Sequence, residues 1–138
     1  MGFEVELRTV DGSTTAVGTA GPHAVVVDRP IEAGGGGHGF NGGQLLHLAV
    51  AGCVSNDLFR EARAKGIALT SVRIVARGDF GGNPPVSQGI EFDVEIRGRA
   101  SEAQLQSLVR EVDAIAEIPN SLRRATAVRL GAVRAARE

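Results

Sequence analysis

Cysteine, lysine and the larger aromatic residues are almost absent from this chain of 138 residues. It has one cysteine, Cys53, one lysine, Lys65, and neither tryptophan nor tyrosine. A single cysteine excludes an internal disulfide, and with it the disulfide framework that stabilises many small secreted domains.

Neither a charge excess nor a long apolar run is present. Lysine and arginine number 15 and the acids 16, a net charge of -1, so no basic surface predicts binding to nucleic acid or an anionic membrane. The longest apolar stretch, LLHLAVAGCV, has about ten residues, whereas a membrane span needs about 20. The first residues, MGFEVELRTV, lack an apolar signal core. We therefore expect a cytoplasmic protein with no nucleic-acid or membrane partner.

What is present suits a globular protein. The hydrophobic fraction is 43%, and the length predicts a single domain over residues 1–138. Phe3, Val5 and Leu7 alternate with charged residues, which predicts a half-buried strand. A turn at 11–14 then predicts a hairpin into a second strand at 15–19, and a β-branched run predicts a third at 23–27.

Two segments have helical periodicity. Residues 44–65 are apolar nearly all round in their first half and amphipathic in their second, and Gly66 follows where a left-handed residue ends a helix. The second helix is expected over 101–116, because Ser101 and Gln104 have the spacing of a capping box and apolar residues recur at helical spacing. Pro119 is expected to end it.

Three further strands complete the expected order of elements. Apolar residues alternate with charged ones over 69–76 and 90–96, with one outward face basic and the other acidic. AVRLGAVR at 127–134 predicts a closing strand. The order is then β-β-β-α-β-β-α-β, an α+β fold with antiparallel sheets around a long central helix. One sheet and one helix cannot cover that helix on every side, so we expect a homodimer in which a second copy covers the rest.

The glycine-rich segment at 33–43 contains a dinucleotide-binding pattern in letters only. Gly37, Gly39 and Gly42 satisfy G-x-G-x-x-G, but the fingerprint requires a parallel βαβ unit with an acid at a strand end about 20 residues later. Asp57 and Glu61 fall inside a helix instead. We interpret the segment as a mobile or tightly turning loop.

The histidines predict neither a metal site nor a cofactor. His23, His38 and His47 lack the i, i+4 pairing of helical zinc sites. His38 is interpreted as an exposed loop residue that could contact a ligand. His47 lies on the most apolar helical turn and is interpreted as a core or interface histidine with a hydrogen-bond partner.

Cys53 is the candidate catalytic nucleophile, with an inert core cysteine as the alternative. Asp57, one helical turn later, would oppose formation of its thiolate, whereas Arg60, two turns along the same face, would favour it. Spacing alone does not decide between these effects.

The segment NGGQLLHLAVAGCVSNDL, residues 41–58, resembles the central helix of the OsmC/Ohr family, the osmotically induced and organic-hydroperoxide-resistance proteins. That family has Asn-Pro-Glu, a pair of large apolar residues, an alanine-rich run and then Ala-Gly-Cys or Ala-Ala-Cys. The matching residues here are Asn41, Leu45, Leu46, Ala49, Ala51, Gly52 and Cys53. The glycine-rich loop, KGIALTSVRIVARGDF and EIPNSLRRA are similar to the family's adjoining segments, so the resemblance covers most of the chain.

The resemblance implies an OsmC-like fold, an intertwined homodimer and thiol peroxidase chemistry. In active members a cysteine thiolate attacks a hydroperoxide and a second cysteine captures the sulfenic acid as a disulfide. Cys53 matches the first cysteine. Gly43 stands at the position of the assisting glutamate and Ile118 at that of the second cysteine, and no lysine or arginine between Thr9 and Asp28 matches the family's arginine.

Two functions are therefore expected from the sequence. The first is a dimeric small-ligand-binding or stress-related protein that lacks most of the peroxidase apparatus, with a small apolar or thiol-bearing ligand near the glycine-rich loop. The second is a one-cysteine thiol peroxidase, in which Cys53 reduces small apolar hydroperoxides and an external thiol completes the cycle.

Overall fold

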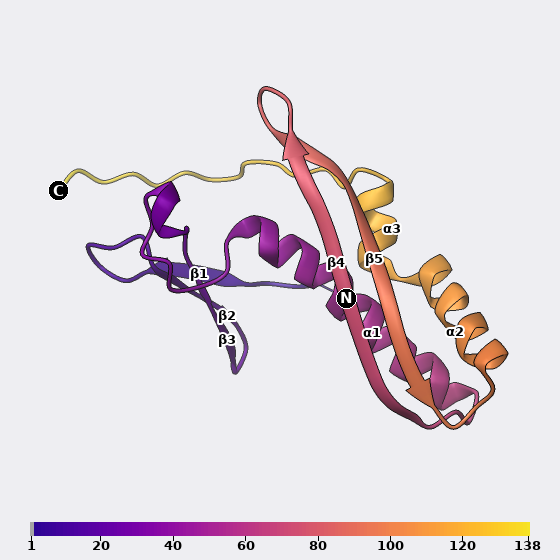
Figure 1. The fold of residues 1–138 in the computed structure, drawn as a ribbon. Coiled ribbons are helices and arrows are strands. Elements are labelled where there is room, and N and C mark those ends of the chain that lie inside the picture. The colour runs from indigo at the N-terminus through magenta and orange to yellow at the C-terminus, as the bar shows by residue number, and fades with distance from the viewer. Residues whose placement is uncertain (1) are drawn as a thin grey trace. The chain divides into compact units, whose positions relative to one another are not determined.

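The computed structural model describes residues 2–138, and their contacts divide the chain into two compact units (Figure 1). The first unit holds the residues up to 51 together with 75–93, and the second holds 52–74 and 94–138. The long helix α1 (Gly42–Ala64) and the strands β4 (Leu69–Gly81) and β5 (Val86–Gly98) each contribute to both units.

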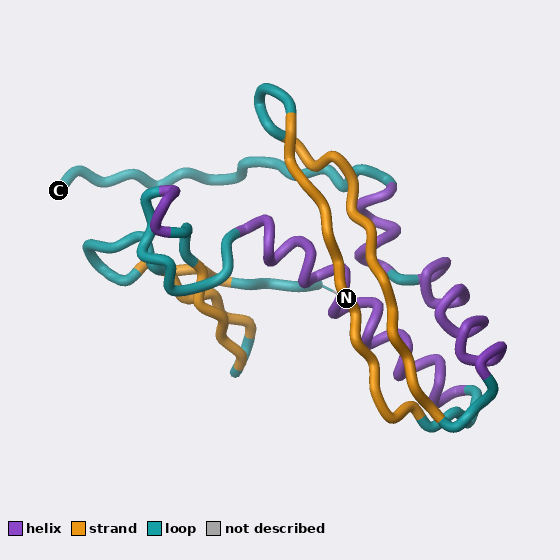
Figure 2. Tube along the Cα trace, viewed as in Figure 1, coloured by secondary structure: helices purple, strands orange, loops and turns teal. Residues whose placement is uncertain are grey.

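The N-terminal part of the first unit is a three-stranded antiparallel meander. It consists of β1 (Glu6–Thr9), β2 (Ala16–Ala20) and β3 (His23–Val27), in the order β1-β2-β3 (Figure 2). Gly12 takes a left-handed φ of 73° in the first turn, which glycine adopts without steric cost. The three predicted strands are confirmed, although the first begins at Glu6 and not at Phe3, and its residues are all exposed and not half-buried.

The strands β4 and β5 form a separate two-stranded sheet, and both are longer than the predicted strands. Their outward faces carry the expected opposite charges. Arg77 contacts Glu91 and Asp93 across the strands, and Arg73 contacts Glu95 at 3.0 Å. All these side chains are exposed and screened by solvent, so the pairs contribute little to stability.

The second unit contains α2 (Glu102–Ile115) and α3 (Glu117–Arg123). The predicted capping box is confirmed, since the Ser101 hydroxyl accepts from the Gln104 amide at 3.2 Å and the Gln104 carboxamide accepts from the Ser101 amide at 2.9 Å. The core of this unit is formed by apolar side chains from α1, from α2 and from the junction with α3. They are Val54, Leu58, Ala62, Leu105, Leu108, Val112 and Ala116, each at most 8% exposed.

Two expectations about the C-terminal part are wrong. Pro119 does not end the second predicted helix, which already stops at Ile115 because Ala116 is extended. The proline lies instead in the first turn of α3, where a missing N–H removes no helical hydrogen bond. Within the described chain, residues 127–134 form no strand, because they pair with no other strand. Val128, Leu130 and Val133 are left 71–93% exposed.

The chain also leaves other apolar side chains uncovered. In the first unit Phe3 and Val5 are at least 75% exposed, and Leu48 on α1 is 50% exposed. The first half of α1 is therefore not covered on every side by its own chain. None of the helices within residues 2–138 combines the length and the apolar character that crossing a membrane requires.

Candidate functional site

The buried carboxylate of Asp28 organises the glycine-rich loop. Asp28 follows β3 directly and is only 3% exposed. Two hydroxyls and three backbone amides donate to it: Thr14 Oγ1 at 2.8 Å, Thr15 Oγ1 at 2.7 Å, Arg29 N at 2.7 Å, Gly36 N at 3.2 Å and His38 N at 3.3 Å. The carboxylate thus joins the residues just before β2 to the middle of the glycine-rich loop.

These donors compensate for the burial of a charged group. The hydrogen bond from Thr15 is the largest effect on the pKa of Asp28. Together with those from Thr14, Arg29 and Gly36 it outweighs desolvation and holds the pKa well below its usual range. Asp28 is therefore ionised at neutral pH, and the loop conformation depends on that charge.

Close backbone packing explains the glycines of the loop. A Cβ atom on Gly35 would lie 2.1 Å from the carbonyl oxygen of Arg29, and one on Gly39 would lie 2.2 Å from that of Val26. Phe40 pairs with the end of β3 through a hydrogen bond from its amide to the Val26 carbonyl at 3.0 Å. The loop is therefore tightly turned, and the neighbouring sheet is antiparallel, so the context of a dinucleotide fingerprint is missing.

His38 is exposed but fixed on one side of its ring. The proton of the Thr15 hydroxyl goes to Asp28, so that hydroxyl accepts from Nδ1 of His38, 3.0 Å away. The same nitrogen lies 3.3 Å from Oδ2 of Asp28, and the side chain is 68% exposed. The interpretation of His38 as an exposed loop residue agrees with this arrangement.

The start of α1 is capped by a pair that the sequence interpretation missed. The Asn41 carboxamide accepts from the Gln44 amide at 2.9 Å, and the Gln44 carboxamide accepts from the Asn41 amide at 2.9 Å. This is a reciprocal capping arrangement with asparagine in the first position. Gln44 therefore serves the helix terminus, and its spacing from Asn41 was the available signal.

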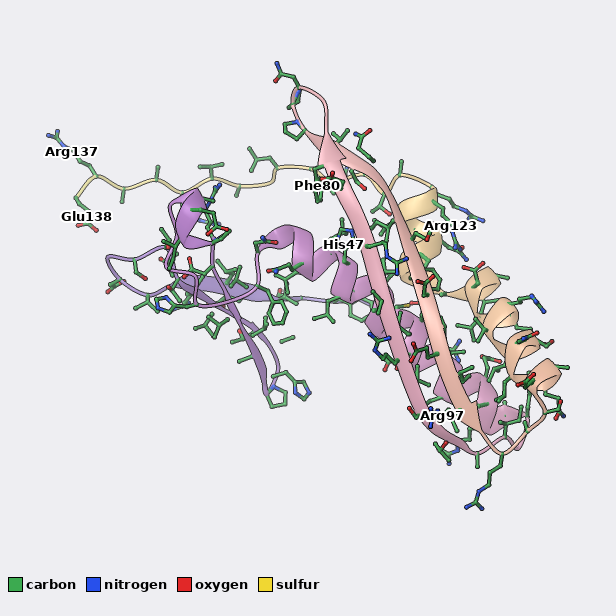
Figure 3. All side chains as sticks on the ribbon, viewed as in Figure 1. His47, Phe80, Arg97, Arg123, Arg137 and Glu138 are labelled. Carbon is green, nitrogen blue, oxygen red and sulfur yellow. The ribbon has the colours of Figure 1, made fainter. Side chains whose placement is uncertain are left out.

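The position of the missing glutamate is closed by an aromatic ring. A Cβ atom on Gly43 would lie 3.2 Å from the Phe80 ring. His47, one turn later, donates from Nδ1 to the Gly43 carbonyl at 2.6 Å and meets the Phe80 ring edge-on, with centroids 6.4 Å apart (Figure 3). The expected partner of His47 is thus a backbone carbonyl. Its buried Nε2 has no hydrogen-bond partner within residues 2–138.

Cys53 lies in the second unit and is half-buried. Asp57, one turn along α1, is 6% exposed. Its Oδ1 contacts Arg60 at 2.8 Å, and its Oδ2 has no hydrogen-bond partner in the described part of the chain. Arg60 also contacts Glu61 at 2.9 Å, and that hydrogen bond, followed by the attraction of Asp57, raises the pKa of Arg60. Two carboxylates therefore already share the charge of the arginine nearest in sequence to Cys53.

No described group of three or more histidine, cysteine, aspartate or glutamate side chains is placed to hold a metal ion. Ile118, at the position of the family's second cysteine, is in the first turn of α3 and is 37% exposed.

The first unit contains an apolar cavity of about 320 Å³, called here the sheet cavity. Its floor is one face of the meander, where Gly18 of β2 pairs with Leu7 of β1 and Val25 of β3. The absence of a side chain at Gly18 hollows that face. The remaining lining residues are Val5, Glu6, Thr19, Ala20, His23, Ala24, Val27 and Leu45.

Three comparisons place the chain among known proteins. A family model described as OsmC-like protein matches residues 34–131. Among solved structures, an OsmC-like protein from Mycoplasma pneumoniae is 18% identical with a TM-score of 0.77, and the match covers 91% of this chain and 90% of that one. No curated protein sequence matches significantly.

Two further solved structures are related to hydroperoxide resistance. The organic hydroperoxide resistance protein OsmC from Legionella pneumophila is 19% identical with a TM-score of 0.59, covering 89% of this chain and 90% of that one. A protein from Vibrio cholerae assigned to organic hydroperoxide resistance, with captopril bound in one active site, is 21% identical with a TM-score of 0.56. That match covers 90% of this chain and 85% of the other. At these identities the similarity shows the fold.

Replacing Asp28 by Asn is expected to destabilise the protein at pH 7, because an amide group would face five donors. The folded-state pKa of Asp28 is depressed, so its contribution is present above the unfolded-state pKa of about 3.9 and is lost as the pH falls further. The difference in urea midpoint between wild type and Asp28→Asn should therefore shrink below about pH 4. Asp11→Asn, at an exposed turn position, is the control. An equal effect of both substitutions at pH 7 would contradict the role of Asp28.

Proposed function

Since the chain belongs to the OsmC-like protein family, we propose that it binds a small apolar or thiol-bearing ligand and does not run the family's two-cysteine peroxidase cycle. The observation that carries this proposal is the sheet cavity, an almost wholly apolar hollow next to the end of β3 and the start of α1. Its volume of about 320 Å³ is at the lower end of the range for small-molecule sites, about 300–1,000 Å³.

The replaced residues support binding over catalysis. The second-cysteine position holds Ile118, and only one cysteine is present, so no intramolecular disulfide can form. The glutamate position holds Gly43, and the Phe80 ring fills the adjacent space. Without that glutamate, its charge is not available to a reaction at Cys53, whereas an apolar wall still binds apolar surface.

The Vibrio cholerae structure supports the ligand class. That protein has a molecule of captopril bound in one of its active sites. By analogy we propose that ligands of similar size with an apolar body enter the sheet cavity of this chain.

Filling the floor of the sheet cavity should abolish binding. The probe is cumyl alcohol, a neutral aromatic alcohol, titrated while the methyl resonances of Leu7, Val25 and Leu45 are followed by NMR. Gly18→Val should raise its Kd at least about tenfold, because two methyl groups would occupy the hollow. Val26→Leu, also in the meander but not among the lining residues, is the matched control and should bind like wild type. Unchanged affinity in Gly18→Val would refute the assignment.

The partial exposure of Cys53 favours a second candidate function. A Cys53 thiolate would attack one oxygen of a hydroperoxide, giving a sulfenic acid and an alcohol, and two equivalents of an external thiol would return the cysteine and release a disulfide and water. The reductant and the hydroperoxide are both external to the protein.

An assay with cumene hydroperoxide and several thiol reductants separates the two candidates. Ligand binding without catalysis predicts that wild type and Cys53→Ser consume peroxide at the same rate, because the charge of Arg60 is already shared by Asp57 and Glu61. Thiol-dependent turnover that disappears in Cys53→Ser would replace the binding proposal with a one-cysteine peroxidase. Mass spectrometry after peroxide treatment should in either case show no internal disulfide.

We further propose that the functional form is a homodimer. The unpaired residues 127–134 alternate in part between apolar and charged side chains, as a strand does, and they have open main-chain hydrogen-bonding groups. The meander offers an edge strand and apolar residues that its own unit leaves uncovered. In a dimer, the second copy of the chain would supply hydrogen-bond partners for residues 127–134 and would cover the apolar residues of the meander.

Replacing Leu130 by Asp tests the dimer. Leu130 is 87% exposed in the single chain, so a monomer would tolerate the change to within about 0.5 kcal/mol. In a dimer that buries Leu130, the variant should dissociate or unfold in analytical ultracentrifugation at micromolar concentration. Ala135→Asp, just beyond the predicted strand, is the control. A monodisperse wild-type monomer would exclude the dimer.

A further inference from the structure

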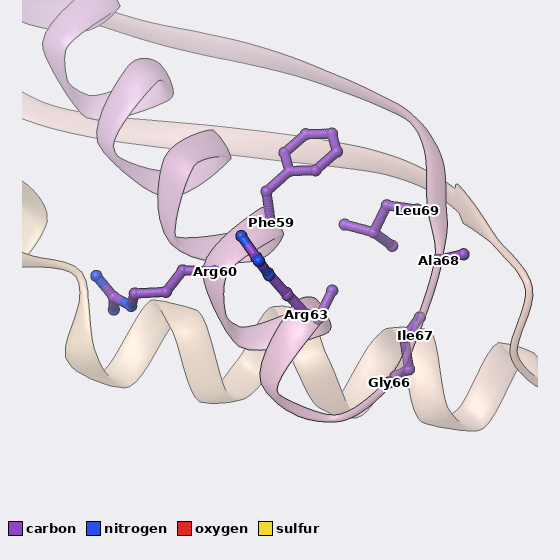
Figure 4. Close-up of a pocket in the computed structure, with 8 residues that line it drawn as sticks. Phe59, Arg60, Arg63, Gly66, Ile67, Ala68 and Leu69 are labelled. Carbon is purple, nitrogen blue, oxygen red and sulfur yellow. The ribbon is translucent and has the colours of Figure 1, made fainter.

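A second cavity lies in the second unit, at the C-terminal end of α1 (Figure 4). Its volume is about 670 Å³, and it is called here the helix-end cavity. The last two turns of α1 and the first residues after them form its wall. The lining residues are Phe59, Arg60, Ala62, Arg63, Gly66, Ile67, Ala68 and Leu69.

The lining combines apolar side chains with two guanidinium groups and contains no carboxylate. Phe59 is 48% exposed toward solvent, although it is the largest apolar residue of the lining. Figure 4 shows Arg63 extending along the side of α1 on which Phe59 lies, whereas Arg60 extends away from Phe59 and Leu69. Phe59 and Arg63 are four residues apart on one helix, a spacing that makes side chains neighbours.

The two arginines differ in how far their charges are compensated. Arg60 contacts Asp57 at 2.8 Å and Glu61 at 2.9 Å. Among residues 2–138, Arg60 pairs with these acids and Lys65, just after α1, pairs with Glu111, whereas no ion pair joins Arg63 to an acid. Arg63 is exposed, and the helix-end cavity therefore has one positive charge without an ion-pair partner beside an apolar wall.

We propose that the helix-end cavity is a binding site for an amphipathic carboxylate, that is, a carboxylic acid with an unbranched apolar chain. Arg63 receives the carboxylate, because a guanidinium matches the two oxygens of a carboxylate in a bidentate geometry. Phe59, Ile67 and Leu69 contact the chain, where burial of apolar surface adds to the affinity. A ligand with only one of these two features would leave either the charge or the apolar wall unmatched.

The position of Arg63 in the last turn of α1 has a simpler explanation, which is attraction to the negative end of the helix dipole. Hydrogen bonds to the last carbonyl groups of α1 weaken that attraction. The amide of Ile67 donates to the carbonyl of Ala62 at 2.9 Å, and the amide of Gly66 donates to that of Arg63 at 3.2 Å. Carbonyls satisfied in this way repel an incoming carboxylate less. The dipole also does not account for the apolar side chains on the same side.

This site is independent of the sheet cavity, whose ligand needs no charge. Binding of decanoate, followed by NMR of uniformly labelled full-length protein, tests it. Decanoate should perturb the resonances of Phe59, Ile67 and Leu69, and Arg63→Gln should raise its Kd at least about tenfold through loss of the charged hydrogen bonds. Decanol should bind wild type at least about tenfold more weakly than decanoate does, and Arg63→Gln should not change its affinity.

Arg110→Gln is the matched control, since Arg110 is exposed on α2 of the same unit and the charge change is identical. Three outcomes would overturn the proposal: equal losses of decanoate affinity in both variants, equal binding of decanoate and decyltrimethylammonium, or no perturbation at millimolar decanoate. A change of oligomeric state in Arg63→Gln without decanoate binding would assign this surface to a second copy of the chain. Perturbations confined to Leu7, Val25 and Leu45 would place decanoate in the sheet cavity and also overturn the proposal.

Discussion

The hydrogen bonds that Asp28 accepts determine how the chain passes from the meander into α1. A carboxylate at the end of β3 accepts from two hydroxyls just before β2, from the next backbone amide and from two amides of the loop, and the loop can close around it only because Gly35 and Gly39 lack side chains. The ionised form is the one that five donors stabilise. The start of α1 and one wall of the sheet cavity follow from that anchored turn.

The positions that correspond to the peroxidase site of the family can be identified in this chain, but most of the reactive side chains are missing from them. Gly43, Ile118 and Cys53 stand where the resemblance places the glutamate and the two cysteines, but only Cys53 retains a reactive group. Apolar groups occupy the other positions, and Arg60 is shared by two carboxylates. The chain therefore has the OsmC-like fold, while the loss of the peroxidase chemistry remains our proposal, based on the residues at these positions.

Much of the fold was predictable because the local patterns are strong. The capping box at Ser101, the alternation in β4 and β5 and the β-branched third strand each indicate their element directly. Residues 127–134 were misassigned because a strand pattern records a preference, whereas a strand needs a partner, and within residues 2–138 this segment pairs with no strand. The role of Asp28 was not predictable. An acid after a strand is common, and its five donors come from segments up to 14 residues away in the sequence.

The sheet cavity and the helix-end cavity were also outside the reach of sequence patterns. Each cavity depends on which side chains remain uncovered after the helices and strands have packed. The periodicity of a sequence predicts only which face of a helix or strand points toward the core. The capping role of Gln44 could have been predicted, since its spacing from Asn41 is that of a capping box with asparagine in place of serine.

The contact between Gly43 and Phe80 also bears on how such a protein can change over evolutionary time. A glutamate introduced at position 43 alone would press its Cβ against the ring, 3.2 Å away, and would carry a charge into aromatic surroundings. Phe80 is 45% exposed, so its ring has solvent on one side into which it can shift. The side chain that position 43 accepts is therefore decided by the conformation of Phe80 and not by the backbone of α1.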